Sequence, residues 1–281
     1  RTPPCSAAIV AAGVARVVVG IPDPHFPGAG IERLRAAGIH VDAGDGAPQI
    51  TSLLRPYLHL RQVGRPYVIV KFAVSLDGMA GAPGSGIRWL TGPAAIERVH
   101  QDRARAGAIL VGSGTVLTDD PALTARPGGI LAARQPLRVV LDSRGRSPLA
   151  ARVFDGQAPT AVATTAASPS GWKAALRARD VDVLEIEPAT TGLSLPGLLD
   201  QLAARGIISV IAEGGPTLHS ALLAQGLAGE VHAYVAPRLL GQGIPLIPAR
   251  SLPLPLELRQ PTVEPLTPDV LIRGYIGTWS P

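Results

Sequence analysis

A glutamate stands directly after an apolar segment that is expected to form a buried strand. The segment Ile208–Ala212 leads into Glu213, then Gly214-Gly215 and Pro216-Thr217. A buried carboxylate is unfavourable unless a partner compensates its charge, so Glu213 is a candidate for chemistry. Glycines let a phosphate approach the backbone, and Pro216 suits the first turn of a helix, whose N-terminus attracts anions. The pattern predicts a phosphate site, although an ordinary tight turn between strand and helix fits it as well.

A second strand-like segment also runs into a glycine-rich stretch. Residues 108–111 are apolar, and Gly112-Ser113-Gly114 after them predicts a turn. Thr115 can then donate a hydrogen bond to a ligand, and Arg126 can clamp an anion because its guanidinium is a fork of donors. Asp119-Asp120, which precede a proline, also fit a turn closed by an aspartate side chain. One of these two carboxylates is therefore expected to be only structural.

A third segment places a cation inside an apolar strand. Lys71 interrupts the β-branched run of residues 67–74, and Asp77-Gly78 after it predicts a turn. An unpaired lysine is rare in such a position, so Lys71 is a candidate for chemistry, although a side chain that reaches out to water is the commoner outcome. Trp89 follows a glycine-rich loop and is either a ligand contact or a core anchor.

Alternating strand-like and helix-like segments must position these residues. Strands are predicted over residues 15–21, 39–42, 67–74, 108–111, 137–141, 160–163, 181–185, 208–212, 231–235 and 270–277, and helices over 30–37, 49–62, 92–105, 169–178, 194–204 and 216–224. Apolar strands that alternate with helices predict an α/β fold, a mostly parallel sheet with helices on both faces. Ligands are then expected at the carboxyl ends of the strands. The Pro- and Leu-rich residues 245–268 are expected to wrap the sheet edge.

Composition limits the classes of function. The chain has 281 residues, 46% of them hydrophobic, with a formal charge of +5. No apolar run approaches the ~18 residues of a membrane helix, and the polar start does not fit a signal peptide. A single cysteine, Cys5, allows no internal disulfide and favours a cytoplasmic protein. Aromatic residues make up 4% and there is no basic run, so a nucleic-acid partner is disfavoured.

Five strings in one order resemble the reductase domain of the bifunctional riboflavin-biosynthesis deaminase/reductase family, RibD/RibG. They are KFAVSLDGMAGAPGSGIRWLTGPAA, RARAGAILVGSGTVLTDDPALTAR, PLRVVLDS, SVIAEGGPTLHSALLAQGL and YVAPRLLG, at residues 71–95, 103–126, 136–143, 209–227 and 234–241. The resemblance spans residues 66–281. It implies a dihydrofolate-reductase-like fold, NADPH as hydride donor, and 5-amino-6-(5-phosphoribosylamino)uracil as substrate. The open-chain sugar would be reduced at C1′ to a ribitylamino group.

The resemblance also implies roles for single residues. Cofactor contacts would come from Ala73, Trp89, Thr115, Asp119, Ser143 and the run Gly215, Pro216, Thr217, Leu218, His219, Ser220 and Ala221. Substrate contacts would come from Ile87, Arg103, Leu123, Arg126 and Glu213, with the arginines on the substrate phosphate. Lys71 would lie close to the reacting sugar, and either Lys71 or Glu213 would assist imine formation or proton transfer. Ile87 departs from the family, which usually has a small polar residue there, often serine.

Residues 1–64 resemble the second half of the family's zinc deaminase. Cys5 matches its last zinc cysteine, and Asp23-Pro24 the loop after the next strand. Such a site needs a histidine, two cysteines and a glutamate, and Cys5 is a lone remnant; His25, His40 and His59 lack the spacing. The segment is therefore expected to be an incomplete deaminase-like domain, truncated at its start, that neither holds catalytic zinc nor deaminates. The reductase domain would be residues 65–281, with the boundary near Gly64.

Three alternatives remain open at this point. A neighbouring reductase that acts on the undeaminated 2,5-diamino-6-ribosylamino-pyrimidinone phosphate would share the cofactor site and differ at positions such as Ile87. A degenerate paralogue that serves as a scaffold would not bind NADPH. A nucleic-acid binder is disfavoured by composition. The family precedent favours a homodimer or tetramer, with residues 231–240 as the expected interface.

Overall fold

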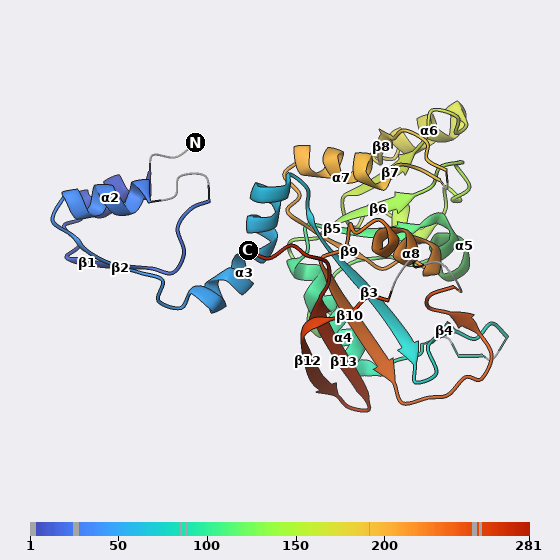
Figure 1. Cartoon of the computed structure of the whole chain (residues 1–281). Helices are drawn as coiled ribbons and strands as arrows, with labels where there is room; N and C mark the ends of the chain where they lie inside the picture. Colours follow the sequence, from blue (N-terminus) through green and yellow to red (C-terminus); the bar gives the residue numbers. More distant parts are fainter. Residues whose placement is uncertain are drawn as a thin grey trace. The chain divides into compact units, whose positions relative to one another are not determined.

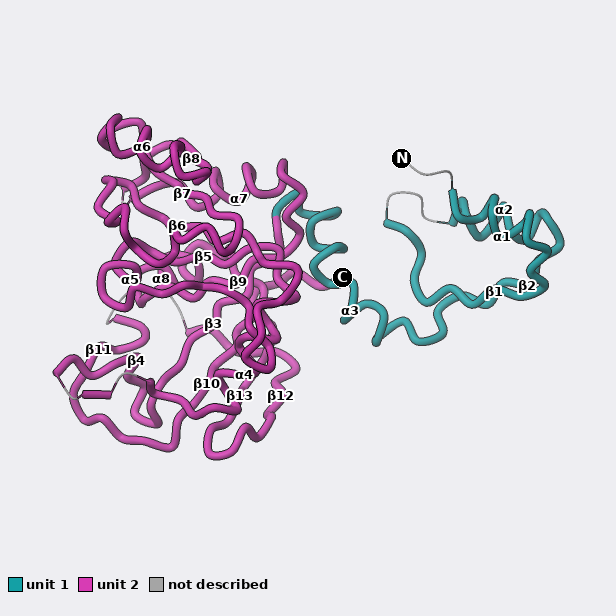
Figure 2. The backbone as a smooth tube through the Cα atoms, turned by 180° about the vertical axis from the view of Figure 1, so that it is seen from behind, with its two compact units in different colours: residues 1–65, 281 teal, residues 66–280 magenta. Residues whose placement is uncertain are grey.

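The computed structural model describes residues 4–24, 28–84, 86–87, 89–190, 192–248, 252 and 255–281. The chain divides into two compact units, Arg1–Arg65 with Pro281, and Pro66–Ser280 (Figure 2). No helix of the described ranges is long and apolar enough to cross a membrane.

The N-terminal unit is built around two parallel strands. Its elements are α1 (Cys5–Ala11), β1 (Arg16–Val19), α2 (Ala29–Ala36), β2 (His40–Ala43) and α3 (Ala47–Val63). β1 pairs with β2 in parallel, and α2 connects them. Leu34, Ile39 and Val41 form the small buried core. Only α1 was not predicted, because its Ala-rich sequence has no clear apolar period.

The C-terminal unit contains the remaining strands and helices. These are β3 (Tyr67–Ser75), β4 (Met79–Gly81), α4 (Pro93–Arg105), β5 (Ala108–Gly112), α5 (Ser113–Asp119), η1 (Pro127–Gly129), β6 (Leu137–Leu141), η2 (Arg152–Phe154), β7 (Thr160–Thr164), α6 (Ser170–Arg177), β8 (Asp182–Glu185), α7 (Leu195–Ala204), β9 (Ser209–Ala212), α8 (Pro216–Ala224), β10 (Glu230–Ala236), β11 (Ile244–Pro245), β12 (Arg259–Leu266) and β13 (Asp269–Tyr275). The predicted alternation of strands and helices is confirmed over most of this unit.

Nine of these strands form one sheet in the order β12-β13-β10-β3-β9-β5-β6-β7-β8 (Figure 1). From β10 to β8 every neighbouring pair is parallel, and only β13 runs against its two neighbours. The predicted mostly parallel sheet is confirmed. Because the carboxyl ends of parallel strands lie at one edge, the segments that follow β3, β9, β5 and β6 meet there.

Both faces of this sheet are buried, which explains why its strands are apolar without alternation. Leu110 of β5 packs into a cluster with α7 and α8, whereas Ile109 and Val111 pack on the opposite face with α5 and α6. Near β10 and β13 that second face is covered by α4, whose Ala95 is fully buried. Helices on both faces were predicted and are present.

Two local predictions were wrong. The stretch after β5 is not a glycine-rich turn but the helix α5, which starts at Ser113 and ends where Asp120 takes a left-handed conformation, φ 41°. Burial of Val116 and Ser113 against the sheet overrides the weak helix propensity of Gly114. Residues 245–268 do not simply wrap the edge: within them, β12 is itself the edge strand, while residues 249–251 and 253–254 lie outside the described part.

The expected interface segment, residues 231–240, is largely internal. β10 pairs with β3 on one side and β13 on the other, so it offers no free edge. Val231, Tyr234 and Ala236 are buried in the core. Only residues after the strand, such as the exposed Leu239, reach the surface. The oligomeric state stays a prediction, and this strand is not a surface for it.

Candidate active site

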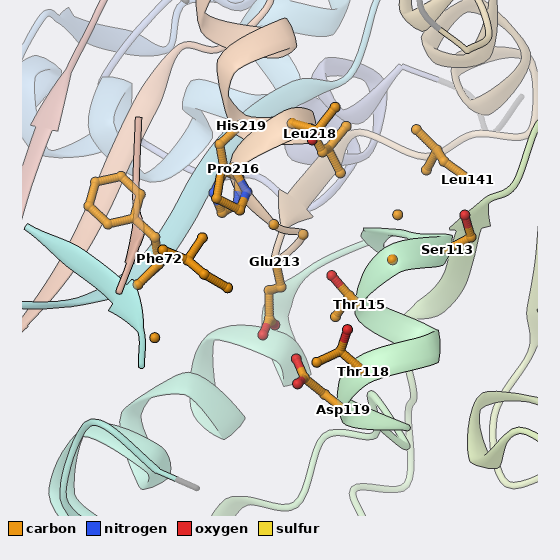
Figure 3. A pocket seen from close by; sticks show the side chains of 18 of the residues that line it. Phe72, Ser113, Thr115, Thr118, Asp119, Leu141, Glu213, Pro216, Leu218 and His219 are labelled. Atoms are coloured by element: carbon orange, nitrogen blue, oxygen red, sulfur yellow. The ribbon is translucent and has the colours of Figure 1, made fainter. Parts of the chain in front are cut away.

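A cleft of about 1630 Å³ opens at the carboxyl ends of the strands. It runs from β3 past β9 and β5 to the loop after β6, so it crosses the centre of the sheet. Figure 3 shows Glu213, Thr115 and Asp119 converging on one space from β9 and α5. The volume exceeds the usual range for a single drug-sized ligand and suits a dinucleotide together with a second molecule.

A buried charge cluster lies at the β3 end of the cleft. The carboxylate of Glu213 accepts two hydrogen bonds from Arg103 on α4, Nε to Oε1 and Nη2 to Oε2, both 2.7 Å long. Lys71 Nζ lies 3.6 Å from Glu213 Oε2. The Glu213 side chain is 5% exposed, Arg103 15% and Lys71 18%. The glutamate therefore has the partners that its burial requires.

The contacts within this cluster change the pKa values of Glu213 and Lys71. Burial alone would raise the pKa of Glu213, but the charges of Arg103 and Lys71 and the Arg103 hydrogen bonds outweigh burial and lower this pKa to about 2. Burial, with the charge of Arg103, lowers the pKa of Lys71 below its ordinary value, while Glu213 opposes that change. At neutral pH Glu213 is thus an anion, and burial makes the ammonium group of Lys71 a stronger acid than that of an exposed lysine.

A second polar layer stands behind Lys71. The ring of Tyr234 on β10 lies 5.5 Å from Lys71 Nζ, and its hydroxyl donates a 3.0 Å hydrogen bond to Asp102 on α4. Arg98 donates to the same carboxylate, and His232 Nδ1 lies 3.5 Å from it. This layer was not predicted, because polar residues on one apolar strand and one helix form no motif in the sequence. These contacts fix the aromatic wall on which Lys71 lies.

The predicted phosphate turn has the close packing that only glycine allows. A Cβ on Gly214 would lie 2.7 Å from Leu218 Cδ2 and 3.4 Å from the backbone nitrogen of Gly112. A Cβ on Gly112 or Gly114 would meet no heavy atom within 4 Å. The turn after β9 therefore packs against the junction of β5 and α5, where Gly112 and Gly114 leave open space. Gly215 precedes α8 with no side chain to cap the helix amides.

Most predicted site residues line this cleft. They are Lys71, Ala73, Ile87, Trp89, Arg103, Thr115, Asp119, Ser143, Glu213, Gly215, Pro216, Thr217, Leu218, His219 and Ala221. Three others lie apart from the lining: Ser220 and Leu123 are buried, and Arg126 is bonded to Thr124 and Gln157. His100, Arg144 and Arg146 line the cleft but were not singled out from the sequence.

The model of the RibD C-terminal domain matches residues 66–272. The chain is 43% identical over 249 residues to the riboflavin biosynthesis protein RibD of Chlamydia pneumoniae, covering 87% of this chain and 66% of that protein. The chain belongs to the RibD family. It spans about two thirds of the length of that curated relative, and its larger unit is the reductase domain of the riboflavin pathway.

Solved RibD structures have the same fold. Acinetobacter baumannii RibD superposes with a TM-score of 0.83 at 35% identity, covering 99% of this chain and 77% of that one. A deaminase/5-amino-6-(5-phosphoribosylamino)uracil reductase from Thermotoga maritima gives 0.81 at 29% identity, with coverage of 98% and 75%. The sheet with helices on both faces is thus the dihydrofolate-reductase-like fold that the resemblance implied.

Metal ligands do not gather in the described ranges of this RibD chain, where no group of three or more His, Cys, Asp or Glu side chains could hold an ion. Cys5 is exposed at the start of α1. His40 lies beside Asp42, and His59 Nδ1 lies 3.0 Å from the carbonyl of Arg65. His25 lies outside the described residues.

His219 of the RibD chain makes the stability pH-dependent. Its pKa is lowered from 6.5 to about 4, because burial disfavours the charged ring, against the opposing hydrogen bond to Ala212. Between pH 6.5 and 4 this histidine is therefore protonated in the unfolded chain but not in the folded chain. As the pH falls through this range, the free energy of unfolding decreases by up to roughly 3 kcal/mol. His219→Gln should flatten the fall in unfolding free energy over this range.

Urea unfolding followed by tryptophan fluorescence measures this effect. Trp89, Trp172 and Trp279 all lie in the C-terminal unit, so the signal reports that unit. His40→Gln is the control, because His40 is an exposed histidine of the N-terminal unit. Identical pH profiles for His219→Gln and the unsubstituted chain would contradict the assignment.

Proposed function

We propose that this chain uses NADPH to reduce 5-amino-6-(5-phosphoribosylamino)uracil to its ribitylamino form. The observation that carries the proposal is the Lys71–Glu213–Arg103 cluster at one end of a cleft large enough for a dinucleotide. The T. maritima relative carries this reductase activity in its name. The RibD family membership supports the same reaction.

The donor set of the cleft fits a dinucleotide. The N-terminus of α8 and the nearby Gly112 and Gly114 at the start of α5 suit a pyrophosphate, because they combine backbone donors with open space. Ala73, Trp89, Thr115, Asp119 and Ser143 line the cleft on either side of these turns. We assign these residues, with Gly215–Ala221, to the cofactor. Ser220 would act only through packing, because its side chain is buried away from the lining.

The chemistry requires a hydride and a proton. Ring opening of the sugar gives a C1′=N imine, and reduction adds a hydride to C1′ and a proton to the nitrogen. NADPH, when bound, supplies the hydride. Among the chain's residues, Lys71 holds a proton at Nζ and Glu213 holds Lys71 and Arg103 in place. We therefore assign proton delivery to Lys71 and positioning to Glu213.

Arg103 and Ile87 are the residues of the cleft that we assign to the substrate. Arg103 uses three of its five N–H groups on Glu213 and the Thr124 carbonyl, which leaves two for an anionic substrate. Ile87 is 38% exposed at the cleft, where the family usually has a polar residue. Leu123 and Arg126 stay predicted contacts, although neither side chain lines the cleft.

The deaminase-like character of residues 1–64 stays a prediction, as does the expectation that this segment holds no catalytic zinc. The cytoplasmic location and the homodimer or tetramer expected from the sequence stay predictions.

NADPH oxidation by the full chain tests the proposal. The deaminated ribosylamino-uracil phosphate is made by a separate active deaminase, and the undeaminated pyrimidine is supplied in parallel. We expect turnover with the deaminated compound and at least tenfold slower turnover with the other. Turnover with the undeaminated compound alone would assign the chain to the neighbouring reductase and direct attention to Ile87. NADPH binding without any turnover would reject both assignments.

A further inference from the structure

We propose that Arg144 and Arg146 bind the 2′-phosphate of the cofactor and thereby make this chain select NADPH over NADH. This inference rests on the proposed function. It concerns the end of the cleft opposite the Lys71–Glu213–Arg103 cluster, where both arginines belong to the lining. Neither residue was assigned a role by its sequence pattern.

The loop that carries the two arginines is held rigidly. It follows β6, and the buried Asp142 carboxylate accepts hydrogen bonds from the backbone nitrogen and the hydroxyl of Ser147, 2.6 and 2.7 Å long. The hydroxyl of Thr164 donates to the carbonyl of Asp142. Trp172 Nε1 donates a 2.9 Å hydrogen bond to the carbonyl of Ser147. Both ends of the segment between Asp142 and Ser147 are thereby fixed.

A glycine at the middle of the loop sets its curvature. Gly145 has φ +68°, and a Cβ there would lie 3.0 Å from Pro169 Cδ and from Trp172 Cε3. The loop therefore packs tightly against the start of α6 through its glycine. The two residues that flank this glycine are Arg144 and Arg146, and both are exposed. Their guanidinium groups thus extend from a preorganised backbone, which lowers the entropy lost when they bind an anion.

The charges of both arginines are available to a ligand. Across the described residues neither arginine forms an ion pair with a carboxylate. Arg146 Nη2 donates a 2.7 Å hydrogen bond to the hydroxyl of Ser113, which places its guanidinium against the first turn of α5. Arginine pairs with phosphate through two parallel hydrogen bonds, so two arginines can hold one phosphate dianion from both sides.

The order of the strands gives the direction of the cofactor. The reacting centre, Lys71 and Glu213, lies at β3 and β9, so the nicotinamide must lie at that end. The pyrophosphate is assigned to the turn after β9 and to the start of α5 after β5, and β6 is the next strand beyond them. Neighbouring strands are about 4.8 Å apart, so the β6 loop lies about 10 Å from the β9 turn. That is the side on which the adenosine half, with its 2′-phosphate, must lie.

NADH has a hydroxyl where NADPH has this phosphate. The other hydroxyl groups beside the two arginines, those of Ser113, Ser143, Thr190 and Ser194, are neutral and do not distinguish a phosphate from a hydroxyl by charge. Discrimination between the two cofactors would therefore depend on the arginines. Loss of both should weaken NADPH and leave NADH almost unchanged.

Calorimetric titration of the full chain tests this inference. NADPH, NADH, 2′,5′-ADP and 5′-AMP are the probes, and the variants are Arg144→Ala, Arg146→Ala and the double substitution. Arg134→Ala is the matched control, because Arg134 is exposed and lies outside the cleft lining. For the double variant we expect about a hundredfold weaker binding of NADPH and 2′,5′-ADP, on the scale of charge-assisted hydrogen bonds, and less than threefold change for NADH and 5′-AMP.

Other outcomes separate the inference from the proposed function. Equal losses for NADPH and NADH would overturn the inference, because they would place the arginines on the shared pyrophosphate. Unchanged NADPH binding in the double variant would overturn it as well. If the unsubstituted chain bound neither NADPH nor NADH, the proposed function itself would fail, and the inference with it.

Discussion

Glu213→Gln is expected to lower kcat/KM by about 10² to 10³-fold and to destabilise the C-terminal unit. The amide would present N–H donors to Arg103, whose Nε and Nη2 now donate to the carboxylate. Two buried cations would then face each other without an anion. Removing one member of a buried pair typically costs about 3–5 kcal/mol. For a unit of this size, where 1 kcal/mol shifts Tm by about 2–4 °C, we expect a Tm lower by roughly 6–20 °C.

Steady-state kinetics and thermal unfolding on the same preparations check this result. Glu185→Gln is the matched control, because Glu185 also pairs with a cation, Lys173 at 2.9 Å, but is 47% exposed and lies outside the cleft. An exposed pair contributes little, so this variant should keep its activity and change Tm by no more than a few degrees. Normal kinetics in Glu213→Gln would show that the carboxylate is dispensable for the reaction.

Lys71→Met is expected to lower kcat by about 10² to 10⁴-fold while the affinity for NADPH stays within about threefold. Methionine fills similar space without charge, and Glu213 keeps its two bonds from Arg103. Because general acids contribute on this scale, loss of the proton donor should appear in the turnover number. The Tm should be unchanged or higher, since one buried cation is removed.

Lys71→Arg distinguishes proton delivery from a purely electrostatic role. Arginine keeps the charge but does not release its proton at accessible pH. If Lys71 delivers the proton, the arginine variant stays as slow as Lys71→Met; recovery of turnover would mean that only the charge matters. In the unsubstituted chain kcat should fall as the pH rises through the Lys71 pKa, which burial keeps below its ordinary value. Lys173→Met, away from the cleft, is the control.

The sheet and the residues at its carboxyl edge could be predicted because local sequence carries them. The apolar run at Ile109 and Leu110 required burial on both faces, and the structure places the two residues in different core clusters. Glu213 after an apolar strand required a partner, and the partner exists. Both predictions depend only on residues that are close together in the chain and on the unfavourable energy of an unpaired buried charge.

The side chains that pair with the site residues could not be predicted from local sequence. Arg103 and Glu213 are 110 positions apart, and no local spacing joins them. Tyr234 and Asp102 are 132 positions apart, so the layer behind Lys71 was not foreseen. A turn was predicted where helix α5 forms, because the packing of α5 against the sheet, which outweighs the weak helix propensity of Gly114, is not visible in the local sequence. The missed features all depend on contacts that the tertiary fold creates.

The position of β3 has a consequence for the synthesis of the chain. This strand opens the C-terminal unit, yet both of its neighbours come late: β9 starts at Ser209 and β10 at Glu230. During translation both edges of β3 stay unpaired until well over a hundred further residues have been synthesised. At typical elongation rates this takes about ten seconds or more. Such an apolar, unpaired strand is prone to aggregate. A chaperone that shields β3 should therefore help this chain to fold, and fragments that stop before β9 should be insoluble.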